Sequence, residues 1–174
     1  MAITVYNVMP IPPDASATRF VDAGPLRIGV EYRTLNDADL DAAYGENADE
    51  MAEIEAHKPA AGVEDEGVSI HVFGDDGKEY LRFDMFDAGP HYHYIVHARG
   101  ENVIVDYDPV ALGDMLPWTL GQLRKRLTPM LERAGAASLA ARIDAAALEP
   151  RLDQVAALAG DASQAVAAQR RARR

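Results

Sequence analysis

The chain has 174 residues, a length typical of one domain, and its 48% hydrophobic and 26% charged residues are ordinary for a globular protein. It contains no cysteine, which excludes disulfides, thiolate metal sites and cysteine nucleophiles. The net charge is −11, and residues 31–90 hold 17 acidic against four basic residues, so nucleic acid is not expected as a partner.

The N-terminal third is predicted to contain two strands and one acidic helix. Residues 18–22 favour a short strand, and residues 26–34 alternate well enough to predict a stronger one. Asn36 is a suitable N-cap for a helix over about residues 37–57, interrupted near Gly45. A loop over residues 58–67 is expected to follow.

A four-stranded antiparallel meander is predicted next, with strands over residues 68–73, 79–86, 91–98 and 101–108. The connections between these strands are rich in glycine and aspartate, which tolerate the dihedrals of tight turns. Strands joined by loops of two to four residues must be antiparallel neighbours.

From Pro109 onward the pattern is helical. Leucines recur at three- and four-residue spacing between Leu116 and Leu131, and Gly135 is expected to end that helix. Further helices are predicted over residues 138–147 and from Pro150 to Leu158, and Gly160 with Asp161 is expected to separate a last one. Four of the last five residues are arginines, which suit the negative end of a helix dipole.

These elements predict an α+β fold. We expect a mainly antiparallel sheet of five or six strands, with the meander at its centre, packed on helices and followed by an α-helical C-terminal extension. The expected organisation is a sheet region with one acidic helix over residues 1–109 and a helical region over residues 110–174. The N-terminus resembles no targeting segment, and no apolar run approaches the length of about 20 residues that spans a bilayer, so we expect a cytoplasmic protein without membrane contact.

Three of the five histidines fall within seven residues, at His91, His93 and His97. Because side chains alternate between the faces of a strand, all three should project from one face. Turn lengths place His93 between Asp84 and Asp106 on the neighbouring strands. The same register groups His97 with Tyr80 and His71, on a polar face that also carries Arg82.

Three interpretations of this face remain open. His91 and His93, with Asp84 or Asp106, can bind a divalent metal ion. Alternatively the face is a metal-free pocket for a small molecule, in which Asp84 or Asp106 orients His93 as a general base. In that pocket the planar guanidinium group of Arg82 could hold an anionic group of the ligand, close to Tyr80, His71 and His97. In the third interpretation, the histidine and aspartate pairs are only a polar, partly solvated surface.

A function of another class is also open. The alanine-rich helices over residues 117–172 could mediate self-association, giving a homo-oligomeric assembly module in which the histidine face is structural. The metal, the ligand and any reaction are not specified by the sequence.

Two local resemblances accompany the histidine segment. The run from Gly89 to His93 resembles the first motif of cupins, in which a His-x-His pair binds metal, but the expected glutamate is replaced by His97 or Ala98 and no later histidine follows. The run Phe83–Asp87, followed by Pro90-His91-Tyr92-His93-Tyr94, is similar to small uncharacterised bacterial proteins of unknown function. That second resemblance implies a domain family but no activity.

Overall fold

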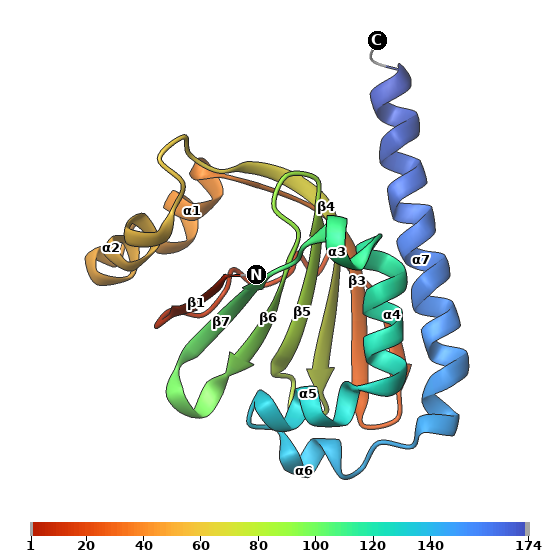
Figure 1. Cartoon of the computed structure of the whole chain (residues 1–174). Coiled ribbons are helices and arrows are strands. Elements are labelled where there is room, and N and C mark those ends of the chain that lie inside the picture. The colour runs from red at the N-terminus through yellow and green to blue at the C-terminus, as the bar shows by residue number, and fades with distance from the viewer. Residues whose placement is uncertain (1, 173–174) are drawn as a thin grey trace.

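The computed structural model describes residues 2–172, and its centre is a single seven-stranded sheet (Figure 1). The strand order is β1-β7-β6-β5-β4-β3-β2, and every neighbouring pair is antiparallel. The strands are β1 (Ile3–Tyr6), β2 (Arg19–Ala23), β3 (Leu26–Asn36), β4 (Glu64–Gly74), β5 (Glu79–Phe86), β6 (His91–Val96) and β7 (Glu101–Asp106). The predicted α+β fold and its central meander are confirmed, and β1 adds one strand beyond the six foreseen.

Helices cover one face of this sheet. They are α4 (Met115–Lys125), α5 (Leu127–Arg133), α6 (Ala137–Ala140) and α7 (Ala145–Ala172), whereas the short α3 (Pro109–Leu112) before them buries no residue. Alternate residues of β4 to β7, among them Ile70, Val72, Leu81 and Phe83, are fully buried and form one hydrophobic core with these helices. The alternation of apolar side chains therefore identified the core face of the sheet correctly.

The long helix α7 contradicts the predicted breaks at Pro150 and Gly160, because both residues lie inside it. Leu148, Leu152, Val155 and Ala159 continue one buried stripe through both positions. Packing of this stripe outweighs the local preferences, and Pro150 lies near the helix start, where it removes only one backbone bond. The last turns of α7 run past the sheet (Figure 1), and Arg173 and Arg174 of the basic end lie outside the described residues.

The opposite side of the sheet carries two short helices inserted between β3 and β4, namely α1 (Asp37–Tyr44) and α2 (Ala48–His57) (Figure 1). Asn36 caps α1 as predicted, and its side chain accepts a hydrogen bond from the amide of Asp39. The predicted interruption near Gly45 is also present. We call α1, α2 and the chain that follows β1 the hood. Its own core consists of Val8, Leu40, Tyr44 and Ile54.

The strand register differs from the predicted one by two residues at each hairpin of the meander. His93 lies opposite Arg82 and Ile104, whereas turn lengths placed it opposite Asp84 and Asp106. At the third hairpin the cause is a 3-10 turn, η1 (His97–Arg99), which shortens the predicted strand and lengthens the loop. A shift of two residues keeps side chains such as His93 on the predicted face. An irregularity in the pairing of β4 with β5, between Val72 and Phe73, changes the face of Tyr80. No helix among residues 2–172 has the length and apolarity required to cross a membrane.

Candidate metal centre

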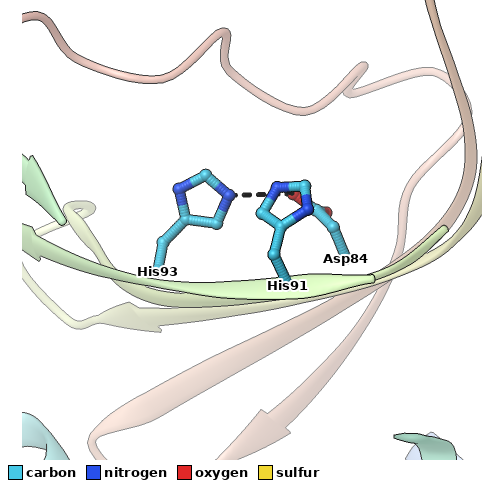
Figure 2. Close-up of side chains that lie close together, drawn as sticks. All are labelled: Asp84, His91 and His93. Atoms are coloured by element: carbon cyan, nitrogen blue, oxygen red, sulfur yellow. Dashed lines mark hydrogen bonds and ion pairs between the residues drawn. The ribbon is translucent and has the colours of Figure 1, made fainter. Parts of the chain in front are cut away.

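Asp84 from β5 and two histidines from β6 meet on the polar face of the sheet. Asp84 lies opposite His91, and His93 is two residues farther along β6 on the same face. Figure 2 shows both imidazole rings and the carboxylate on one side of the strand. One ligand atom from each residue lies within 4.8 Å of the other two. We call these three residues the His–Asp trio.

Hydrogen bonds fix the orientation of both imidazole rings. His91 directs Nδ1 to the carbonyl oxygen of Gly89 at 2.7 Å, and His93 directs Nδ1 to Oδ1 of Asn102 at 2.7 Å. A carbonyl oxygen only accepts, so Nδ1 of His91 carries the proton. The Nε2 atoms of His91 and His93 consequently face Oδ2 of Asp84, at 3.3 and 3.0 Å.

Asp84 and His93 are buried, His91 is partly buried, and the three side chains shift one another's pKa values. Burial raises the pKa of the Asp84 carboxyl, but its interactions with His91 and His93 outweigh this effect and hold the pKa well below 3.8. Burial lowers the pKa of His91, yet its hydrogen bond to Asp84 and the Asp84 charge raise the pKa above 6.5. For His93 the effect of burial prevails and the pKa is lowered, which favours a neutral imidazole. Ser69 completes the site by donating from Oγ to Oδ1 of Asp84 at 2.5 Å.

A second polar cluster lies beside the trio and surrounds His71. This histidine is fully buried and contacts Glu79 through Nδ1 at 2.6 Å and Glu31 through Nε2 at 3.2 Å. Arg82 binds Glu79 with two nitrogens, at 2.8 and 2.6 Å, and is 3% exposed. Arg82 also lies opposite His93, so the two clusters are adjacent.

The remaining predicted site residues lie elsewhere. A register irregularity between Val72 and Phe73 pairs Phe73 with Glu79 and brings Glu79 to the polar face. Tyr80 instead packs against the hydrophobic core, and the centroids of its ring and of the His97 ring lie 5.4 Å apart. The grouping of Tyr80 with His97 is present, but His71 is not part of it. Asp106 lies opposite His91, is exposed, and does not belong to the cluster of ligand atoms.

The trio and Arg82 form the floor of a cavity of about 310 Å³, whose roof is the hood. Asn102, Arg33 and Lys58 add polar groups to the wall, and Leu40, Tyr44 and Ile54 add apolar ones. Small-molecule sites are typically concavities of about 300–1,000 Å³ with mostly apolar walls and a few convergent polar groups. The cavity meets that description at the lower end of the range.

Sequence reasoning missed Asn102, Ser69, Glu31 and the hood. Asn102 and Ser69 carried a usable signal, because both occupy polar-face positions on strands adjacent to Asp84 and His93. Strict alternation with Leu81 and Phe83 would put Glu79 on the apolar face, and this mismatch of a charged side chain with an apolar face is the sequence sign of the irregularity that moves it.

Two imidazole nitrogens and one carboxylate oxygen, each oriented by an outer hydrogen bond, can hold a divalent ion and leave coordination positions open.

Comparison with known proteins adds a family but no activity. No curated protein and no solved structure matches the chain. Residues 20–159, which include all of the trio and most of the hood, match the family described as "Domain of unknown function (DUF7700)". The chain therefore belongs to this family of domains of unknown function, DUF7700.

Proposed function

We propose that this protein binds one divalent transition-metal ion through Nε2 of His91, Nε2 of His93 and Oδ2 of Asp84, and presents the ion to a small molecule in the cavity. The observation that carries the proposal is the occupation of both Nδ1 atoms by oxygen acceptors, which turns both Nε2 atoms toward one carboxylate oxygen. Histidines that bind metal ions almost always have such an outer partner on the second ring nitrogen.

The distances support a shared ion. Ligand atoms at about 2.0–2.2 Å from one metal ion lie about 3.0–3.5 Å from each other in tetrahedral or octahedral arrangements. The two nitrogen-to-oxygen distances are 3.0 and 3.3 Å, and the third distance, between the two nitrogens, is at most 4.8 Å, so a bound ion would draw the two rings together. Two histidines and one carboxylate on one side of an ion, with the other positions open, are typical of Fe²⁺ and catalytic Zn²⁺ sites. An ion held in this way could polarise a bound ligand or activate water.

Zinc titration of the untagged protein by isothermal calorimetry tests the proposal. The wild type should bind one Zn²⁺ per chain, and His91→Gln, His93→Gln and Asp84→Asn should each weaken binding at least tenfold. His97→Gln is the matched control, because His97 is on the same segment and bonds the carbonyl of Glu79 instead of the trio. Its zinc affinity should equal that of the wild type.

A second variant separates the ligands from their supports. Asn102→Ala removes the acceptor for Nδ1 of His93 and should weaken zinc binding by about 10–100-fold, the usual effect of losing an outer partner. Zinc at 100 times its Kd should stabilise the wild type by about 2.7 kcal/mol and the Asp84→Asn variant by much less. Absence of stoichiometric zinc, cobalt and iron binding would refute the proposal and favour the metal-free pocket, in which Asp84 orients His93 as a base.

A further inference from the structure

The cavity above the trio has two chemically different halves. Its floor is made of polar groups on β5, β6 and β7, whereas its roof is made of apolar side chains of the hood, chiefly Leu40, Tyr44 and Ile54. A ligand that fills such a cavity needs a polar end toward the sheet and an apolar body toward the hood.

Arg82 supplies a cationic group beside the proposed metal position. Its Nε and Nη2 atoms bind Glu79, and within the described residues Nη1 makes no hydrogen bond. Arg82 lies opposite His93 and two residues from Asp84, and neighbouring side chains on one sheet face lie about 5–8 Å apart at Cβ. A single anionic group could therefore contact Nη1 and an open coordination position together.

A second cation lies on the same side of the cavity. Arg33 lines the cavity, donates from Nη2 to the carbonyl oxygen of Ile11 at 3.0 Å, and pairs through Nη1 with Glu31 at 3.4 Å. Arg82, Arg33 and the roof residue Tyr44 all line this cavity.

The charges nearest the proposed metal position favour an anion, and Asp106, a further carboxylate of the cavity wall opposite His91, is exposed to solvent. A divalent ion bound to two neutral imidazoles and one carboxylate leaves one positive charge at the centre, and Glu79 compensates Arg82. Asp65, on the cavity wall, is already engaged by the backbone amides of Ala88 and Gly89. A carboxylate is the simplest anionic group that matches a planar guanidinium nitrogen and a metal position together.

We infer that the cavity takes a small organic monocarboxylate with an apolar body, its carboxylate held by the metal ion and Nη1 of Arg82 and its hydrocarbon part under the hood. This inference rests on the proposed metal site and adds the class of ligand. Both the carboxylate and the apolar body of the ligand must contribute to binding, since the floor alone would accept any small anion.

Calorimetric titration of the zinc-loaded wild type with three probes tests the inference. Benzoate has both ends, benzamide has the same shape without the charge, and acetate has the charge without the body. Benzoate should bind at least tenfold more tightly than benzamide and than acetate. Benzoate should also bind the metal-free protein at least tenfold more weakly than the zinc-loaded protein. This comparison needs no substitution.

Arg82→Lys tests the role of the guanidinium. Lysine retains a charge to pair with Glu79 but lacks the nitrogen that would reach the ligand, so zinc affinity should remain and benzoate affinity should fall at least tenfold. Equal binding of benzoate and benzamide, equal binding of benzoate and acetate, or no binding of any probe overturns the inference while zinc binding still stands. Loss of zinc binding itself overturns the proposed function and this inference together.

Discussion

Replacing Glu79 by glutamine probes the buried charge cluster that supports the floor of the cavity. The Glu79 carboxylate is 8% exposed and accepts hydrogen bonds from Arg82 Nε at 2.8 Å, Arg82 Nη2 at 2.6 Å and His71 Nδ1 at 2.6 Å. Burial raises the pKa of Glu79, but the charge and hydrogen bonds of Arg82, with those of His71, lower it from 4.5 to about 2. At about 1.4 kcal/mol per pKa unit, this shift corresponds to about 3 kcal/mol. Removal of one partner of a buried ion pair costs a similar amount, about 3–5 kcal/mol.

The pH dependence follows from the direction of that shift. Because the folded-state pKa lies below the unfolded-state value, the ionised Glu79 stabilises the fold above pH 4.5, and this contribution is lost as the pH falls toward 2. Protonated glutamate and glutamine have similar shapes and no charge. The free energies of unfolding of the wild type and Glu79→Gln should therefore differ by about 3 kcal/mol at pH 7 and converge near pH 2.

Urea denaturation at several pH values, followed by circular dichroism, measures this difference. Glu149→Gln is the matched control, because its ion pair with Arg124 is equally short at 2.6 Å but its side chain is 54% exposed. Exposed pairs contribute about 0–1 kcal/mol, so this control should stay within 1 kcal/mol of the wild type. A difference below 1 kcal/mol for Glu79→Gln at pH 7, or one that stays constant down to pH 3, would refute the reasoning.

Three further predictions use the same denaturation assay. Burial lowers the pKa of His71, but the hydrogen bonds that it donates to Glu31 and Glu79 raise the pKa above 6.5. Its stabilisation is therefore complete below pH 6.5 and lost above the folded-state pKa, and His71→Gln should remove that loss of stability with rising pH. Gly67→Ala should destabilise the fold by about 1–3 kcal/mol, because a Cβ atom at this position would clash with the backbone oxygen of Met85. Gly121→Ala, in helix α4 with open space around it, should instead stabilise the fold by about 0.5–1 kcal/mol. Leu152→Ala should cost about 2–5 kcal/mol because the side chain of Leu152, on the buried face of α7, is fully buried.

The polar face could be predicted from the sequence because the face of a side chain depends only on whether its position in the strand is odd or even. Apart from the irregularity between Val72 and Phe73, the errors in hairpin register were two residues, and such an error changes the neighbours of a side chain without changing its face. His91, His93 and Asp84 were therefore assigned to one face correctly, while His93 was placed opposite Asp106 instead of Ile104. Loop length depends on local turns such as η1, whose sequence also suits the end of a strand.

The hood could not be predicted, for a different reason. Within α1 and α2 the buried residues are Leu40, Tyr44 and Ile54, too few to give a clear helical stripe. Only in the fold do they meet Val8, from the chain that follows β1, and close over the sheet. A core assembled from single residues of distant segments has no periodicity that a sequence window can detect.

The buried polar face is itself an argument for a site. Ser69, His71, Arg82, Asp84 and His93 are each at most 4% exposed, although apolar residues of the same size would cover a sheet at lower energetic cost. Buried ion pairs contribute little net stability, so the need for a stable sheet does not explain why five polar side chains lie there. The hood that covers them has a core of only four residues and leaves a cavity above the trio instead of a packed interface. A sheet face that is polar, dehydrated and incompletely covered is the arrangement expected of a binding site.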